Sequence, residues 1–410
     1  MTPVVKAVQR ARGAIVNIHG RKTIVDEQDF TGEGRRVNGM GTGVIVDERG
    51  YVLTNYHVVE GVDRIHVSMA DGTDKIARLV ARDDKTDLAI IMIPTDHPLP
   101  TIPVGTSSDL MLGESVIAIG NAYGYEHTIT RGVISALNRA VEVSETQKYS
   151  NLIQTDASIN PGNSGGPLLN IDGEMIGINA AVRVGAVGIG FAIPVDTAMA
   201  VAGKLLTIER IDNRYHGVDG VTMIDGPRQR FLVRNVAEGS PGAAAGLKAG
   251  DIVRGINDQE VARAIDFERR LIGAADATTQ TLKIERGDTT LSLKLALSAP
   301  PAPKQTVEEQ VWEVVGLKLT PSLASDFRRL RSSYRGGLKV LAVKPESPAA
   351  RQGIRMGDVL VGMHVWETVS MDHMQYILSR PDFASIQPLK FFILRGGETL
   401  YGHLPMTLQR

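Results

Sequence analysis

Residues 160–167 read Asn-Pro-Gly-Asn-Ser-Gly-Gly-Pro, and five of these eight residues are Gly or Pro. Such a composition is typical of a tight turn that holds a loop. The same turn would expose the hydroxyl of Ser164 and point successive backbone N–H groups in one direction, because glycine allows backbone geometry that a side chain obstructs. The stretch alone therefore leaves two interpretations open, a structural turn or a turn that presents a nucleophile.

Two further motifs favour the second interpretation. Acyl transfer by serine needs a base within reach of the hydroxyl, an acid that orients the base, and donors that face the oxyanion. His57 stands at the end of a predicted strand in Thr-Asn-Tyr-His-Val-Val, and Asp87 opens a hydrophobic strand in Thr-Asp-Leu-Ala-Ile. Each residue alone is more often structural than catalytic, but the order His, Asp, Ser is that of a chymotrypsin-type triad.

The sequence thus predicts a catalytic site in the first half of the chain. In it Ser164 is the nucleophile, His57 is the general base and Asp87 is the acid that orients the base. The N–H groups of Gly162 and Ser164 would form the oxyanion hole, with Asn163 between them. The other histidines show neither paired metal-ligand spacing nor an HExxH motif, so we expect no metal and no other cofactor.

The spacing of apolar runs predicts the fold of this first half. From about Gly13 to Ile193, short apolar runs alternate with turn signals, and Asp71-Gly72 and Asp172-Gly173 mark hairpins. Many short strands with no alternating helices predict an all-β barrel or a pair of barrels. The first clear helix is expected at about residues 195–206, after a Pro-Val-Asp start.

The second half of the chain contains an internal repeat. Residues 240–253 align without gaps to residues 347–360, at an offset of 107 residues. That offset is too long for a solenoid unit and suits two small domains of one type. The Pro-rich start of residues 298–310 is typical of a semi-rigid linker. We therefore expect three domains and a linker, over residues 1–208, 214–298, 299–308 (the linker) and 309–410.

Composition excludes several classes of function. The chain of 410 residues carries a formal net charge of −1, which gives no global footprint for nucleic acid or anionic membranes. It has no cysteine, so disulfides, thiolate catalysis and cysteine-based zinc sites are excluded. No apolar run approaches the roughly 20 residues of a membrane span. The N-terminus lacks the features of a signal peptide, which indicates either a cytoplasmic protein or a mature or trimmed chain.

The motifs around His57, Asp87 and Ser164 resemble those of a known family. TNYHVV, TDLAI and NPGNSGGPLL, followed by GINAA and GIGFAIP, are similar to the HtrA (Deg) serine proteases, and the tandem repeats resemble PDZ domains of its DegP and DegQ branch. The resemblance implies a mainly β chain, with a chymotrypsin-like double β-barrel followed by two PDZ domains. It implies an ATP-independent endopeptidase that degrades unfolded or damaged proteins in quality control and stress response. It also implies the periplasm or cell envelope, and a homotrimer or larger assembly.

The resemblance also assigns binding residues. The primary specificity pocket corresponds to Ile159, Val182 and Ile189, whose aliphatic side chains would favour cleavage after a small or medium aliphatic residue. PDZ domains add an extended peptide C-terminus to a sheet edge and hold its carboxylate in a backbone nest. The two nests would be Tyr215, His216, Gly217 and Val218 in the first copy, and Val314, Val315, Gly316 and Leu317 in the second.

His216 departs from this pattern, because its slot is usually apolar. Such a histidine is more often merely exposed, but it could also make peptide binding sensitive to pH.

Two other functions stay open on the sequence alone. One is a chaperone or peptide-binding scaffold in which proteolysis is minor or switched off. The other is a regulatory protease that cuts one specific partner after peptide sensing. An intact triad argues against a degenerate enzyme, but it leaves the resting state of the oxyanion hole undecided.

Overall fold

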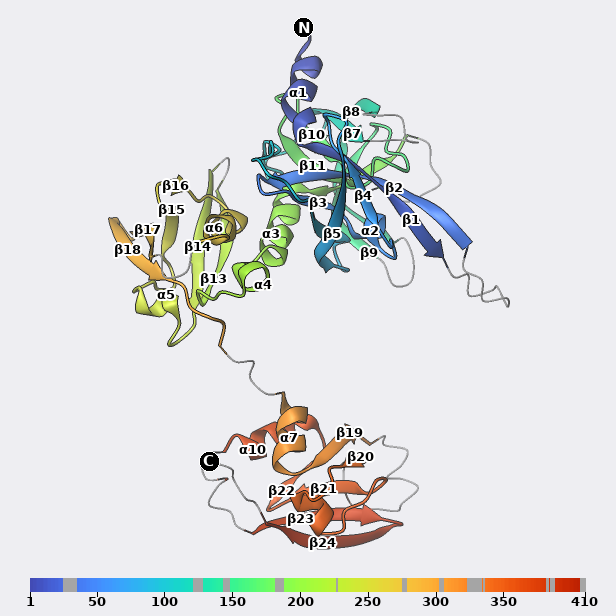
Figure 1. Ribbon diagram of the computed structural model, residues 1–410, viewed down its shortest axis with the longest axis vertical. Helices are drawn as coiled ribbons and strands as arrows, with labels where there is room; N and C mark the ends of the chain where they lie inside the picture. The colour runs from blue at the N-terminus through green and yellow to red at the C-terminus, as the bar shows by residue number, and fades with distance from the viewer. Residues whose placement is uncertain are drawn as a thin grey trace. The chain divides into compact units, whose positions relative to one another are not determined.

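The chain forms two compact units, residues 1–300 and 301–410 (Figure 1). The computed structural model describes all residues except 25–34, 121–127, 143–147, 181–187, 226–227, 275–278, 302–305, 323–333, 335, 381–382, 384–387 and 406–410.

Two closed antiparallel barrels make up the first part of the first unit, which confirms the predicted double barrel. The first barrel has the order β1-β2-β3-β6-β5-β4, with β1 (Ile15–Ile24), β2 (Arg35–Asp47), β3 (Tyr51–Asn55), β4 (Ile65–Ser68), β5 (Asp74–Asp83) and β6 (Leu88–Met92). The second has the order β10-β11-β12-β9-β8-β7, with β7 (Ser115–Gly120), β8 (Thr128–Glu142), β9 (Lys148–Thr155), β10 (Pro167–Leu169), β11 (Met175–Ala180) and β12 (Gly190–Pro194). The hairpins predicted at Asp71-Gly72 and Asp172-Gly173 join β4 to β5 and β10 to β11.

Helices precede and follow the double barrel in the chain. The expected helix after the barrels is α3 (Val195–Leu205), followed by α4 (Ile208–Asp212). The expectation that it is the first helix was wrong, because α1 (Pro3–Ala11) and the short η1 (Arg12–Ala14) precede β1. Thr2 caps α1 and proline stands in its first turn, but its buried face is only Ala7 and Ala11, which is a weak apolar signal.

Two sheets of the same strand order follow the barrels, as the repeat predicts. The first has the order β13-β14-β15-β17-β18, with β16 paired to β15, and the second β19-β20-β21-β23-β24, with β22 paired to β21. The elements of the first are β13 (Val218–Asp225), β14 (Arg228–Val236), α5 (Pro241–Ala244), β15 (Ile252–Ile256), β16 (Gln259–Glu260), α6 (Ala264–Leu271), β17 (Thr279–Arg286) and β18 (Thr289–Ala296). Those of the second are α7 (Val307–Val314), β19 (Leu317–Pro321), β20 (Leu338–Val343), α9 (Pro348–Arg351), β21 (Val359–Met363), β22 (Trp366–Glu367), α10 (Met371–Leu378), β23 (Leu389–Arg395) and β24 (Glu398–Leu404).

The repeated Gly-Asp turn carries the same ion pair in both copies. Asp251 accepts from Arg286 at 2.7 and 2.8 Å, and Asp358 accepts from Arg395 at 2.7 Å through each of its oxygens. Burial alone would raise the pKa of Asp251, but hydrogen bonds from Arg286 and the Lys248 amide lower it overall. The turn therefore anchors the scaffold of each domain.

Charged contacts also join the first of these domains to the first barrel. Asp47, at the end of β2, accepts from Arg49 through both oxygens at 2.8 Å. Arg49 Nη2 also donates to the Arg269 carbonyl at 2.8 Å, and Arg269 Nη1 donates to the Val46 carbonyl at 2.6 Å. These bonds attach the C-terminal half of α6 to the turn between β2 and β3.

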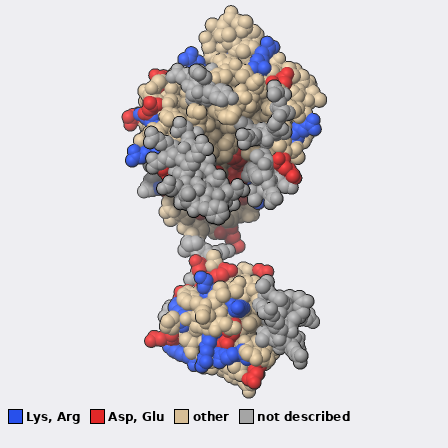
Figure 2. Space-filling view, turned by 90° about the vertical axis from the view of Figure 1, so that its right-hand side faces the viewer, with Lys and Arg blue, Asp and Glu red and all other residues tan. Residues whose placement is uncertain are grey.

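The surface carries charges of both signs. Figure 2 shows acidic and basic side chains interspersed on one face, with basic side chains gathered along part of the C-terminal unit. Of the described helices, none has the length and apolar character needed to cross a bilayer. The described residues also contain no cluster of three or more His, Asp or Glu side chains that could hold a metal ion.

We predict that Asp47→Asn lowers the free energy of unfolding at pH 7 by about 2 kcal/mol, the size of a lost hydrogen bond to a charged group. Burial would raise the pKa of Asp47, but Arg49 and Arg269 lower it below its usual value of 3.8. Its stabilisation is therefore complete above the unfolded-state pKa and is lost as pH falls through the lower folded-state pKa. Urea unfolding followed by circular dichroism should show the difference from wild type shrinking below about pH 4. The exposed Asp63→Asn serves as control, and equal stability of the two variants at pH 7 would contradict the prediction.

Candidate active site

The structure brings His57 and Asp87 together at one end of two paired strands. His57 lies in α2 (Tyr56–Val59), the single helical turn that follows β3, and Asp87 directly precedes β6. In the pairing of β3 with β6, Asn55 lies opposite Leu88, so the residues just beyond them are neighbours. His57 Nδ1 lies 2.6 Å from Asp87 Oδ2, and the His57 backbone N–H donates to Asp87 Oδ1 at 2.8 Å.

The backbone around Asp87 is fixed in an uncommon conformation. Its φ of +54° lies in the left-handed region, which a non-glycine residue adopts only when its surroundings impose it. The Tyr56 N–H and the Asn55 side-chain amide both donate to the Asp87 carbonyl at 3.0 Å. The Asp87 side chain is 6% exposed, whereas the His57 side chain is 42% exposed. One nitrogen of the imidazole is thus held by a buried carboxylate while the ring stays accessible.

Tyr149 is a further residue of this site that sequence reasoning missed. Its hydroxyl donates to Asp87 Oδ2 at 2.8 Å, so that oxygen binds both the tyrosine and the imidazole. Tyr149 lies on β9 of the second barrel, whereas Asp87 and His57 belong to the first. The bond therefore joins the two barrels, and no local sequence motif around Tyr149 predicts it.

The Ser164 turn lies against the same end of the first barrel as His57 and Asp87. The Thr42 N–H donates to the Ser164 carbonyl at 2.8 Å, and the Thr42 hydroxyl donates to the Gly162 carbonyl at 2.7 Å. At Gly165, whose φ is +81°, a Cβ would lie 2.2 Å from the Thr42 carbonyl oxygen and 3.0 Å from the Asn55 nitrogen. Only glycine allows the turn to come this close to the strand that leads into His57.

The peptide groups of the turn have distinct partners. The Asn163 N–H donates to the Asn160 carbonyl at 2.9 Å, which leaves it unable to serve an oxyanion. Gly162 has a φ of +103°, and its N–H makes no hydrogen bond to the described part of the chain. The Gly162 N–H is therefore available as one of the two donors that the predicted oxyanion hole needs.

Two of the three residues expected in the specificity pocket fall within the described chain. Ile159 packs against Gly190, where a Cβ would lie 2.6 Å from the Ile159 side chain. Ile189 is the residue next to that glycine, and it is 38% exposed. Val182 lies outside the described residues.

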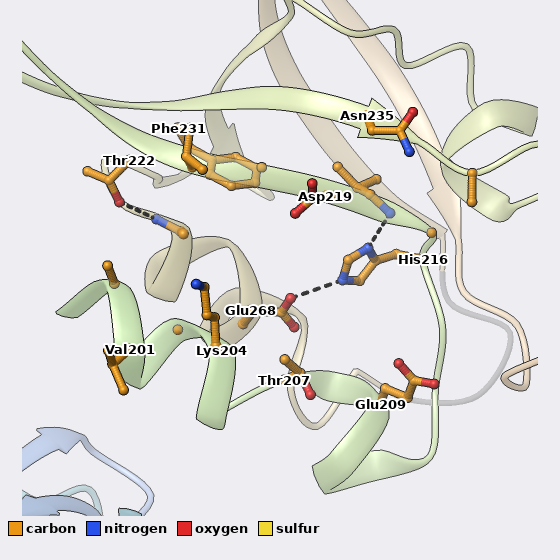
Figure 3. Close-up of a pocket in the computed structure, with 18 of the residues that line it drawn as sticks. Val201, Lys204, Thr207, Glu209, His216, Asp219, Thr222, Phe231, Asn235 and Glu268 are labelled. Carbon is orange, nitrogen blue, oxygen red and sulfur yellow. Dashed lines mark hydrogen bonds and ion pairs between the residues drawn. The ribbon is translucent and has the colours of Figure 1, made fainter. Parts of the chain in front are cut away.

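The two expected carboxylate loops have the same backbone geometry. Gly217 and Gly316 have φ values of +71° and +84°, and a Cβ on either would lie 2.1 Å from the Cβ of Ser240 or Ser347. Figure 3 shows the pocket beside the first loop, which has a volume of about 830 Å³ and lies between β13, α6 and α3. His216 is only 8% exposed, so the expectation of an ordinary exposed histidine was wrong.

We predict that Tyr149→Phe lowers kcat about tenfold and leaves KM within about twofold, because the hydroxyl acts through its bond to the Asp87 carboxylate. Steady-state kinetics on a chromogenic peptide would measure both constants. Tyr51→Phe, in β3 of the same domain, is the control and should keep both near wild type. An unchanged kcat, or a loss confined to KM, would remove Tyr149 from the site.

Residues 41–178 match the trypsin-like peptidase domain, and residues 210–297 match the PDZ domain. The chain is 34% identical over 387 residues to a probable periplasmic serine endoprotease DegP-like of Halomonas elongata, covering 90% of this chain and 79% of that protein. It is 33% identical over 377 residues to the periplasmic pH-dependent serine endoprotease DegQ of Escherichia coli, covering 88% and 80%. It is 38% identical over 325 residues to a putative serine protease HhoA of Synechocystis, covering 71% and 82%.

Proposed function

The chain belongs to the DegP/HtrA family of serine endoproteases, and from that premise we propose that it degrades unfolded or damaged proteins without ATP, as part of protein quality control. The observation that carries the proposal is the buried Asp87 carboxylate. It binds both the backbone N–H and the imidazole of His57, and it lies at the same end of the barrel as the Ser164 turn.

In the proposed mechanism, the His57–Asp87 bond determines which atom acts as the base. Asp87 holds Nδ1, so Nε2 accepts the proton of the Ser164 hydroxyl as the oxygen attacks the substrate carbonyl. The N–H groups of Gly162 and Ser164 stabilise the resulting oxyanion. The imidazolium then gives its proton to the leaving amine, and water hydrolyses the acyl-enzyme by the same steps in the second half of the reaction.

The proposal extends to what the enzyme recognises. An aliphatic pocket built on Ile159, Val182 and Ile189 would favour cleavage after Val, Ile, Ala or Leu, since it offers no acid to hold Lys or Arg. The PDZ domains would capture peptide C-termini at residues 215–218 and 314–317. Names of relatives place them in the periplasm, and we propose the periplasm or cell envelope and a homotrimer or larger assembly for this chain.

Ser164→Ala tests the nucleophile. We expect it to abolish labelling by a fluorophosphonate probe and to lower casein hydrolysis by about 10⁴-fold or more, while binding of C-terminal peptides stays intact. Residual hydrolysis within about tenfold of wild type would overturn the assignment of the triad. A wild-type chain that suppresses aggregation but neither labels nor cleaves would favour the chaperone alternative. Failure to cut generic unfolded substrates while cutting one partner would favour a regulatory protease.

A cleavage-site profile tests the specificity pocket. Mass spectrometry of fragments from one unfolded substrate, with and without added C-terminal peptides, should show cuts after small and medium aliphatic residues. Ile189→Asp should shift cuts toward Lys and Arg, because a carboxylate in the pocket would bind a basic side chain. Ile171→Asp is the matched control, since Ile171 is 36% exposed in the β10–β11 turn and should leave the profile unchanged. Cuts after basic residues by the wild type would contradict the proposed pocket.

A further inference from the structure

The His216 imidazole has a partner at each ring nitrogen. The Val218 backbone N–H donates to Nδ1 at 2.9 Å, and Nε2 lies 3.1 Å from Glu268 Oε1. Figure 3 shows the ring between the Glu268 carboxylate of α6 and the backbone nitrogen at the start of β13. Glu268 is itself fixed, because its other oxygen accepts from the Ile208 N–H at 2.9 Å. The ring of Phe267 packs edge-on against the imidazole at 5.1 Å.

The Val218 N–H would be open to the groove if the imidazole were absent. The Ala237 N–H donates to the Gly217 carbonyl at 2.7 Å, which makes Val218 and Val236 a non-hydrogen-bonded pair of the ladder. The Val218 N–H therefore points away from β14. In a PDZ-type nest, such backbone N–H groups receive the carboxylate of a bound peptide. The imidazole thus occupies a donor that the ligand needs.

The second PDZ domain gives an internal comparison. Its Lys344 N–H donates to the Gly316 carbonyl and its Ala349 N–H to the Val315 carbonyl, as Ala237 and Gly242 do in the first domain. These bonds identify Val315 as the counterpart of His216 and Leu317 as that of Val218. Valine has no acceptor, so its side chain leaves the Leu317 N–H to the groove.

We propose that His216 sets the affinity of the first PDZ groove, because its imidazole occupies the Val218 N–H that a peptide carboxylate must take over. The proposal rests on the proposed capture of C-termini by PDZ domains. An arriving carboxylate takes the Val218 N–H, and the imidazole gives up its bonds to Val218 and Glu268. The first groove therefore binds C-terminal peptides more weakly than the same loop would with valine at position 216.

The hydrogen bonds also fix the tautomer. Because Nδ1 accepts, the proton of the neutral ring is on Nε2 and points to Glu268. Other ionisable side chains line the pocket from each neighbouring element, namely Asp196 and Lys204 of α3, Glu209 of α4, Arg214 before the loop, Tyr215 within it, Asp219 of β13 and Glu268 of α6.

The test compares Ser164→Ala with Ser164→Ala/His216→Val in the full chain. The probe is a short peptide that ends in valine with a free carboxylate and carries a benzophenone. Crosslinks located by mass spectrometry report each groove separately, and labelling of the second domain is the internal reference. We expect His216→Val to lower the peptide concentration that half-saturates the first groove about tenfold at neutral pH. The reason is that the peptide carboxylate no longer competes with the neutral imidazole for the Val218 N–H. The C-terminally amidated peptide should show no gain.

Two outcomes would overturn the proposal. One is equal affinity of the first groove for the free-carboxylate peptide in the two proteins, and the other is an equal gain for the amidated peptide. If the valine variant fails to fold, His216→Leu takes its place, because leucine also lacks an acceptor. Ser164 is replaced in both proteins, so the outcome does not depend on whether the wild-type chain cleaves casein.

Discussion

The proposed catalytic arrangement depends on one strand of the first barrel, β2, binding the turn at residues 160–167 in the second. Thr42 donates its N–H to the Ser164 carbonyl and its hydroxyl to the Gly162 carbonyl, and its own carbonyl accepts from Thr54 Oγ1 at 2.7 Å. Thr42 and Thr54 are fully buried, so these bonds form away from competing water. With His57 as the proposed base and Asp87 as its acid in the first barrel, this contact would set the distance across which the proton moves.

The bond from Tyr149 to Asp87 acts across the barrels in the opposite direction. Thr42 of the first barrel binds the turn at residues 160–167, and Tyr149 of the second barrel binds the Asp87 carboxylate. A carboxylate with donors on both oxygens has little freedom to rotate, and the imidazole that it binds is oriented with it. In the proposed mechanism these bonds hold the site from both sides before substrate arrives, which would limit the entropy lost on reaching the transition state.

The sequence predicts the parts of this protein that local chemistry determines. The turn at residues 160–167, the hairpins at Asp71-Gly72 and Asp172-Gly173, and the repeated Gly-Asp turn follow from short-range patterns, and the structure has the hairpins and the repeat where they are expected. The bonds of Thr42 and Tyr149 join residues far apart in the chain, and they depend on strand register and barrel closure. The contact between Glu268 and His216 cannot be predicted for the same reason, because the two residues lie 52 positions apart in the chain. No single-sequence pattern carries such information.

The two PDZ domains separate what the scaffold fixes from what a side chain can change. Each pairs a buried aspartate with a partly exposed arginine, and in each a glycine with positive φ closes the proposed carboxylate loop against a serine. With the loop backbone held alike, replacing Val315 by its counterpart His216 leaves the shape of the nest and alters the availability of its N–H. A rigid backbone turns one side-chain difference into a difference in ligand chemistry. On that proposal, two copies of one fold divide the work of peptide recognition within a single chain.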